Sequence, residues 1–292
     1  MIEPQASSFD KISPTALMVA YTRQFTDIPY SKELAQLVDA QTIVEQLLEQ
    51  KSEKPIEVAV LLEGRYKAIN QVMAQFEATQ VIELASGLLP RGMAMSQNPC
   101  VTFVESDLPA MIKRKQRLVK QLIGERPNLH LIAIDATSRP SQFPLHADYL
   151  HPGKPVIVLC EGLLMYLTFA EKQQVFANVR EMLQAYGGVW ITSDLITLDG
   201  LSRIRQNNPA LYKLGQRIDS MTGRSVTDNY FESFDHAKQF ASEQGFWIEE
   251  YSMLDVMDQL TCLSPLDIDL DVAKSLLAAS SVFVLTVKDG LS

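Results

Sequence analysis

The chain has 292 residues, and its 35 acidic residues outnumber its 26 lysines and arginines, which gives a formal net charge of −9. This acidity excludes a nucleic-acid binder that relies on overall positive charge. Hydrophobic residues make up 47% of the chain, enough for a buried core and too many for a disordered protein. We expect one domain over residues 1–292, although the length alone would also suit two small domains.

The first 78 residues are predicted to form an N-terminal helical region, because their apolar side chains recur every three or four positions. The predicted helices are 15–25, 31–48 and 56–76. Ser31 is a predicted N-cap of the second helix, with Glu33 close to the positive end of the helix dipole.

Residues 79–194 change pattern, because short apolar β-branched runs now alternate with amphipathic helices. Continuous apolar strands separated by helices are typical of a parallel sheet covered on both faces, so we predict a doubly wound α/β fold. Ligands of such folds bind beyond the carboxyl ends of the strands. The predicted strands are 81–84, 101–104, 129–134, 156–160 and 188–192, and the main helices between them are 109–123 and 168–183.

The last third of the chain adds two further features. The polar, helical stretch 195–240 interrupts the alternation and is interpreted as a cap insertion over the site. Residues 241–292 contain two more predicted strands, 245–248 and 281–287, of which the second lies close to the end of the sequence and is expected to enter the sheet last.

The three cysteines, Cys100, Cys160 and Cys262, are far apart and have no metal-ligand spacing. This pattern disfavours a disulfide framework or a zinc site and favours a reducing compartment. No apolar run approaches the ~18 residues that a membrane span needs, and no signal peptide is evident. We therefore expect a cytoplasmic protein that binds neither membrane nor nucleic acid; the sequence leaves its oligomeric state open.

The first predicted strand runs into the small residues of the segment Glu83-Leu84-Ala85-Ser86-Gly87, which would let a ligand approach the backbone closely. Gly87 and Gly92 are five residues apart, so the glycine fingerprint of a dinucleotide-binding enzyme is missing. A tight strand-to-helix turn without a ligand explains this segment equally well.

Acidic residues recur at the ends of the predicted strands, namely Glu83, Glu105 with Asp107, Asp135 and Glu161. Acids after the second strand of a doubly wound fold suit the two hydroxyls of a ribose. Taken alone, Asp107 before Leu108-Pro109 fits a helix N-cap better. Together, acids along one rim suit a ligand rich in hydroxyl and amino donors, such as adenosine joined to a cationic group. A divalent metal is the less favoured alternative, because no histidine accompanies the acids.

Several segments in this order resemble the leucine carboxyl methyltransferase family, and most closely its bacterial branch similar to polyketide O-methyltransferases. No single motif is highly specific, but their order and spacing together are. The segments that carry the resemblance are Glu63–Asn70, Glu83–Gly87, Glu105–Pro109, Lys113–Lys115 and Glu161–Leu167.

The resemblance implies a class I methyltransferase that uses S-adenosylmethionine and releases S-adenosylhomocysteine. It also implies a seven-stranded sheet of order 3-2-1-4-5-7-6 with the seventh strand antiparallel. Arg65 would pair with the methionine carboxylate of the cofactor, because a guanidinium fork suits a carboxylate. Asp107 would bind the ribose hydroxyls, and Glu161 would lie near the amino group and sulfonium. Ala85 and Gly87 would line the loop beside the methionine and ribose, and Asp135 and Ala136 would hold the adenine edge. Glu83 and Glu105, from the acids at the strand ends, complete the predicted cofactor-binding residues.

The sequence departs from the family pattern at several positions. Ala85 stands where many members have glycine, Asn70 where an acid is common, and Leu89 where many have aspartate. A lysine found near the cofactor carboxylate in eukaryotic members is missing, and Arg23 is a candidate to replace it. These differences affect the predicted acceptor more than the predicted cofactor.

The favoured function is O-methylation of a carboxylate or hydroxyl of a small molecule. A carboxylate acceptor needs no general base, whereas a hydroxyl would gain from one. The weak candidates for a catalytic group are Tyr21, Tyr166 and His236. The alternatives are a nicotinamide-dependent oxidoreductase and a non-catalytic module that binds S-adenosylmethionine.

Overall fold

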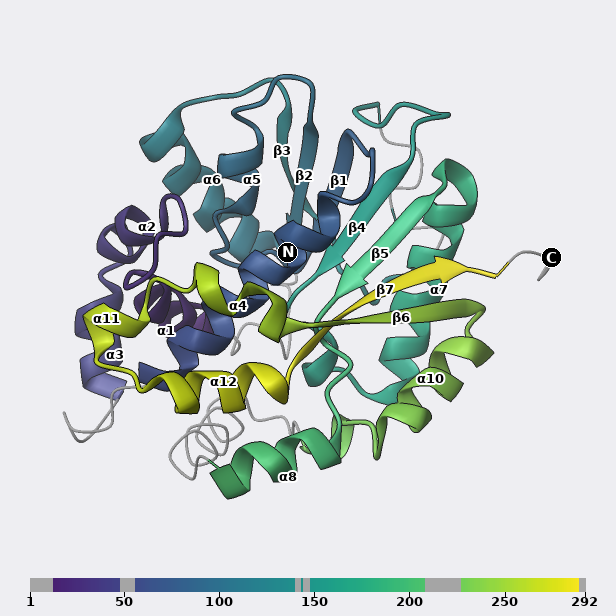
Figure 1. The fold of residues 1–292 in the computed structure, drawn as a ribbon. Helices are drawn as coiled ribbons and strands as arrows, with labels where there is room; N and C mark the ends of the chain where they lie inside the picture. Colours follow the sequence, from purple (N-terminus) through teal and green to yellow (C-terminus); the bar gives the residue numbers. More distant parts are fainter. Residues whose placement is uncertain (1–12, 48–55, 140–142, 144–147, 208–226, 289–292) are drawn as a thin grey trace, which may run out of the picture.

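The computed structural model describes residues 13–47, 56–139, 143, 148–207 and 227–288 (Figure 1). The strands form one seven-stranded sheet of order β3-β2-β1-β4-β5-β7-β6, in which β7 runs antiparallel to both neighbours. The predicted doubly wound fold and strand order are therefore confirmed. The strands are β1 (Gln80–Leu84), β2 (Thr102–Asp107), β3 (Leu129–Ala133), β4 (Val156–Cys160), β5 (Gly188–Thr192), β6 (Phe246–Ser252) and β7 (Ser281–Val287).

Strand β1 lies in the middle of the parallel part of the sheet, between β2 and β4. Its register sets Glu83 opposite Glu105 of β2 and opposite Leu159 of β4. The carboxyl ends of β1, β2 and β4 consequently meet at one edge. The loops that follow these three strands are therefore the natural place for a binding site.

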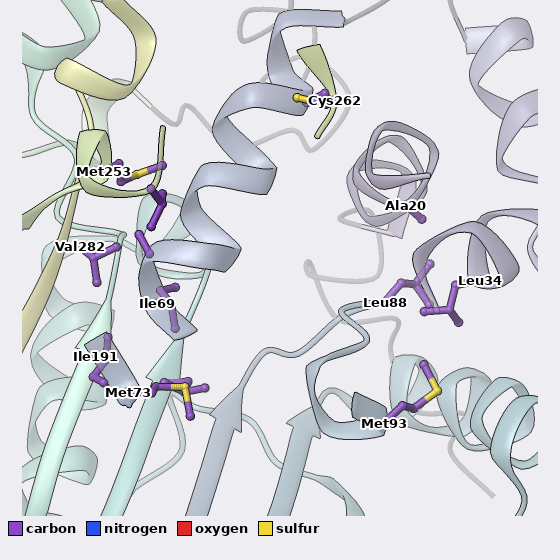
Figure 2. Packing of buried hydrophobic residues seen from close by; sticks show 14 of the residues in the cluster. Ala20, Leu34, Ile69, Met73, Leu88, Met93, Ile191, Met253, Cys262 and Val282 are labelled. Carbon is purple, nitrogen blue, oxygen red and sulfur yellow. The ribbon is translucent and has the colours of Figure 1, made fainter. Parts of the chain in front are cut away.

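The sheet is covered on both faces, because its residues alternate between two apolar clusters. On one face, Val81 and Ile191 pack with helices from the N-terminal region and with residues near the end of the sequence; Figure 2 shows part of this cluster. On the other face, Ile82 and Trp190 pack with α7 (Phe169–Tyr186) and α10 (Phe234–Glu243). The helices up to β5 are α1 (Ser13–Arg23), α2 (Ser31–Leu37), α3 (Ala40–Leu47), α4 (Ile56–Met73), α5 (Arg91–Met95), α6 (Pro109–Ile123) and α7 (Phe169–Tyr186).

The N-terminal region is helical as predicted, with one division that the periodicity misses. The predicted helix 31–48 is split into α2 and α3, and Asp39 between them has a positive φ of 51°. The predicted N-cap at Ser31 is wrong. Tyr30 takes that place with φ 63°, and no side chain caps the helix.

The region predicted as a cap contains α8, η4 and most of α10. Its ends are joined where Thr197 and Phe231 form an isolated parallel bridge. Helix α10 packs against β6, at the side of the sheet where Figure 1 also shows α7. Residues 208–226 lie outside the described part, so the role of a cap stays a prediction. The remaining elements are α8 (Leu198–Asn207), α10 (Phe234–Glu243), α11 (Leu263–Leu266), α12 (Leu270–Ala278) and the 3₁₀ segments η3 (Leu164–Tyr166), η4 (Thr227–Asn229) and η5 (Met253–Gln259).

Within the described residues, none of the helices combines the length and the apolar character that crossing a membrane requires.

Candidate active site

Three arginines from three helices converge on Glu161, the first residue after β4. Arg23 of α1 and Arg65 of α4 both donate to Oε1 of Glu161, at 2.5 and 3.1 Å. Arg91 of α5 donates to Oε2 at 3.1 Å. The Glu161 side chain is 2% exposed, so its charge is compensated by these guanidinium groups rather than by water.

Each nitrogen of the Arg91 guanidinium donates a hydrogen bond inside the protein. Its Nη1 donates to Glu83, its Nη2 to Glu161, and its Nε to Oδ1 of Asn70 at 3.0 Å. Its Cζ lies over the Tyr66 ring, 4.5 Å from the ring centre, and the Arg91 side chain is fully buried. Arg91 therefore joins β1, α4 and the loop after β4, and each of its three nitrogens has a partner within the protein.

Arg65 and Arg23 have N–H donors without a partner among the described residues. Of the three nitrogens of Arg65, only Nε has a hydrogen-bond partner there, and the Arg65 side chain is 19% exposed. Nε of Arg23 is buried without a partner in the same part of the chain. An orphaned donor in a buried site points to an acceptor that is supplied from outside.

The cluster separates the pKa values of its two carboxylates. The three arginines outweigh the effect of burial on Glu161 and lower its pKa to about 2. Burial dominates at Glu83 and raises its pKa to about 7, although Arg91 opposes the shift. Burial also lowers the pKa of Arg23 to about 10. The cluster thus favours the ionised form of Glu161, whereas burial disfavours the ionised form of Glu83.

The loop after β1 is fixed by a hydrogen bond to a carboxylate from β2. Oδ2 of Asp107 accepts from the Gly87 N–H at 2.7 Å, and Oδ1 accepts from the Leu108 N–H at 2.7 Å. Ala85 and Gly87 have positive φ values of 51° and 48°, and an added Cβ at Gly87 would meet no heavy atom within 4 Å. The turn predicted here is present, and Gly87 faces open space.

The N-cap interpretation of Asp107 is wrong. The N-cap of α6 is Leu108, and Pro109 is the first helical residue. Asp107 is the last residue of β2, and its carboxylate bridges two loops instead of capping a helix. This places it at the rim where the sequence predicted a ribose-binding acid.

Glu83 and Glu105 were expected at strand ends on the rim, and this placement is corrected. Both lie within their strands and are fully buried. Glu105 accepts from the Gly92 N–H at 3.1 Å and pairs with Lys115 at 2.8 Å. An added Cβ at Gly92 would lie 2.3 Å from the Glu105 carboxylate. Because side chains two apart share a face, Glu105 lies on the face of Asp107 but deeper, and supports the loop from below.

Asp135 and Ala136 follow β3, and the structure gives them mainly local contacts. Oδ1 of Asp135 accepts from the backbone and the hydroxyl of Thr137, at 2.9 and 2.7 Å. The Ala136 carbonyl accepts from Asn178 of α7 at 2.9 Å. The carboxylate thus forms a turn at the end of β3, and the assignment of these two residues to the adenine edge stays a prediction.

Asp194 is a site residue that sequence reasoning missed. It follows β5, is 1% exposed, and accepts from the N–H groups of Gly162, Leu163 and Leu164 at 2.7, 2.6 and 3.0 Å. It therefore fixes the loop that carries Glu161. The sequence carries a signal for it, because this acid stands two residues after the fifth predicted strand.

The three candidate catalytic residues lie in different surroundings. Tyr21 is buried in the N-terminal cluster and meets Phe25 edge to face at 5.6 Å. Tyr166 is 7% exposed in η3, five residues after Glu161. His236 stacks on Phe169, and its Nδ1 accepts from the backbone N–H of Glu232 at 3.2 Å. That bond occupies one ring nitrogen of His236, and the role of a base stays a prediction for all three residues.

In the described part of the chain, no group of three or more His, Cys, Asp or Glu side chains is arranged to hold a metal ion.

Comparison with known proteins gives relatives of similar sequence over part of the chain. The chain is 32% identical over 104 residues to a "Putative S-adenosyl-L-methionine-dependent methyltransferase" of Mycobacterium bovis, and equally to one of Mycobacterium tuberculosis. The match covers 35% of this chain and 34% of each relative, so the chain aligns with about a third of their length.

Two solved structures share the fold over most of their length. A "putative methyltransferase" from Thermobifida fusca has a TM-score of 0.52 at 18% identity and covers 93% of this chain and 94% of its own. A DUF574 family protein from Streptomyces avermitilis has a TM-score of 0.56 at 13% identity and covers 94% and 97%. Residues 15–180, more than half of the chain, match the leucine carboxyl methyltransferase family. The resemblance inferred from the sequence is thus confirmed, and the chain belongs to the leucine carboxyl methyltransferase family.

Proposed function

We propose that the protein is an S-adenosylmethionine-dependent methyltransferase that methylates an oxygen, a carboxylate or a hydroxyl, of a small molecule. The observation that carries the proposal is the arginine cluster at the end of β4. It keeps unused donors beside an ionised glutamate, at the edge of the sheet where ligands of this fold bind. Family membership gives independent support.

The residues fit the amino-acid end of the cofactor. The terminal nitrogens of Arg65 have no partner among the described residues, and its side chain is partly exposed, which suits a bidentate bond to the methionine carboxylate. The unpartnered Nε of Arg23 offers a second donor for the same group. Glu161 remains ionised and would accept from the ammonium group. Together these residues complement a zwitterion.

The residues also fit the ribose end. Asp107 is fixed by two backbone N–H groups, and its remaining lone pairs would accept from the ribose hydroxyls. The buried hydroxyl of Ser86 has no partner among the described residues. Gly87 borders open space, so a sugar could approach the backbone there. Asp135 and Ala136 would hold the adenine edge.

The bound cofactor supplies a methyl group on a positively charged sulfur, and an oxygen of the acceptor displaces that sulfur in line. The chain contributes by holding the two reactants in line and excluding water, and such positioning supplies about 7–11 kcal/mol. An acceptor carboxylate is already ionised and needs no base. A hydroxyl acceptor would need one, for which Tyr21, Tyr166 and His236 remain the candidates.

Calorimetry with two ligands and two proteins tests this proposal. S-adenosylhomocysteine should bind the wild type at sub-millimolar concentration, and its decarboxylated analogue should bind at least tenfold more weakly. In Arg65→Ala, S-adenosylhomocysteine should lose a similar factor while the analogue loses little, because the carboxylate and Arg65 act as a pair. Arg117→Ala, which removes an exposed arginine of α6, is the matched control.

Two results would contradict the proposal. One is a wild-type protein to which no adenosyl compound binds. The other is a wild-type protein that binds but transfers no labelled methyl group from S-adenosylmethionine to any member of a metabolite library, which would favour the non-catalytic module.

A further inference from the structure

The buried ion cluster has more positive than negative charge. Its directly bonded members are the guanidinium groups of Arg23, Arg65 and Arg91 and the carboxylates of Glu83 and Glu161. Even with both glutamates ionised, one positive charge remains, and protonation of Glu83 would increase the excess. Burial makes an unbalanced charge costly, so the cluster gains from an added anion.

The charges next to the cluster do not cancel this excess. Lys115 and Glu105, which face Glu83 from α6 and β2, form a balanced pair of their own. Tyr66 of α4 faces Arg91, and burial raises the pKa of its hydroxyl, so it stays neutral. Asp107 is held by backbone N–H groups, and Lys115 is the charged group that acts on it.

Asn70 is a position at which an aspartate would add a further carboxylate next to Arg91. Its Oδ1 accepts from Nε of Arg91 at 3.0 Å, and its side chain also hydrogen-bonds the Tyr66 hydroxyl. An aspartate of nearly the same shape would keep the bond to Arg91. The asparagine satisfies this donor of the fully buried Arg91 without adding negative charge. The Nε of Arg91 is thus bonded to a neutral group, while its two terminal nitrogens are bonded to carboxylates.

We propose that Asn70 is a positioning residue for ligand recognition: because it is neutral, it satisfies the Nε of Arg91 while leaving the cluster the excess positive charge that selects a ligand with a carboxylate. This inference rests on the proposed function, since the ligand carboxylate considered is that of S-adenosylhomocysteine. Arg65 and Arg23 make the contact, and Asn70 sets the charge against which they act.

The variant Asn70→Asp tests the inference, because it adds one charge at nearly constant shape. At pH 8, S-adenosylhomocysteine should bind Asn70→Asp about tenfold or more weakly than the wild type, as expected for a new carboxylate near a charged site. The decarboxylated analogue, which lacks the anionic group, should lose no affinity. Thermal unfolding should be unchanged or shifted upward, because Arg91 gains an ionic partner.

Gln71→Glu is the matched control. Gln71 is the next residue of α4, is exposed, and accepts from Gln259 through its amide oxygen, as Asn70 does from Arg91. This variant also replaces an amide by a carboxylate, but outside the cluster, and should bind both ligands like the wild type.

Three outcomes would overturn the inference. Unchanged binding of S-adenosylhomocysteine to Asn70→Asp would show that the excess charge is not used. An equal loss for both ligands would show a general disturbance of the site. Lack of wild-type binding to either adenosyl ligand would contradict the proposed function itself, and this inference with it, and is distinguished by the wild-type measurement alone.

Discussion

Glu161 is the residue on which the site depends most, because its carboxylate is the meeting point of α1, α4 and α5. Glu161 stabilises the protein through its ion pairs with the arginines and not through its burial. A carboxylate left at this depth without the arginines would be strongly destabilising, and so would the arginines without the carboxylate.

Glu161→Gln should lower the free energy of unfolding at pH 7 by about 3–5 kcal/mol, because it leaves buried guanidinium groups without their partner. The pKa of Glu161 is lowered from 4.5 to about 2, so its stabilisation is present above pH 4.5 and is lost as the pH falls toward 2. The variant should lack this part of the acid sensitivity. Denaturant unfolding between pH 7 and pH 3 measures both effects.

Glu125→Gln provides the control for this prediction. Glu125 forms an ion pair with Lys120 on the surface, where solvent screens the interaction, so its loss should hardly change unfolding. If Glu161→Gln were as stable as Glu125→Gln at pH 7, the role given to the arginine cluster would be wrong.

At the residue scale, the sequence predicted that acids lie at the carboxyl-end edge of the sheet, but not how deeply each acid is buried. The alternation of a strand places Glu105 and Asp107 on one face, and this was readable from the sequence. Which of the two reaches the rim depends on where β2 ends and on the fit of Gly92 over Glu105. Those are tertiary distances, and no spacing encodes them.

At the scale of elements, the loop between β4 and α7 is fixed from two sides. Asp194 accepts from three consecutive N–H groups at its start, and Thr168 and Glu171 form a capping box at its end. The short 3₁₀ turn η3 lies between these anchors. The loop therefore presents Glu161 in one orientation to the arginines.

Asp194→Asn should lower the free energy of unfolding by about 2–4 kcal/mol, because bonds from N–H groups to a buried charged acceptor become weaker or are lost. Affinity for S-adenosylhomocysteine should fall as well, since Glu161 would lose its fixed position. Calorimetry and denaturant unfolding on the same samples test this. Thr168→Ala, at the far end of the loop, should cost about 1 kcal/mol and leave affinity unchanged; equal affinity in both variants would contradict the role of Asp194.

The helical elements also show where sequence periodicity reaches its limit. The segment 31–48 carries one continuous helical pattern, yet the chain turns at Asp39 so that α3 packs against α1. In α4, Glu63 accepts from the backbone of Thr261 and Cys262, which lie about two hundred residues away. The motif containing Glu63 and Arg65 therefore serves two purposes, attachment of a distant segment and the site, and the sequence alone suggested only the second.

At the scale of the whole molecule, ligand binding and folding are coupled. The site draws together α1, α4, α5 and the ends of β1, β2 and β4, so a ligand there binds only the folded chain. The carboxylate of such a ligand would also give the unused arginine donors a partner. Binding should consequently stabilise the fold as a unit rather than one loop of it.

S-adenosylhomocysteine at one hundred times its dissociation constant should stabilise the fold by about 2.7 kcal/mol and raise the melting temperature by roughly 5 °C. NAD at the same concentration should leave it unchanged, because the glycine fingerprint that such a cofactor needs is missing from the β1 loop. Differential scanning calorimetry measures both. A shift with NAD and none with the adenosyl ligand would support the oxidoreductase alternative instead.

The sequence by itself determined the class of fold, the rim on which acids gather and the family, because strand alternation, loop composition and motif order are local properties of a chain. Only the tertiary structure decided which charges meet. Arg23, Arg65, Arg91 and Glu161 come from four separate segments, and their contact depends on how α1, α4 and α5 pack around the end of β4. The cluster's excess charge is therefore a property of packing, and so is the neutral contact of Asn70 that preserves it.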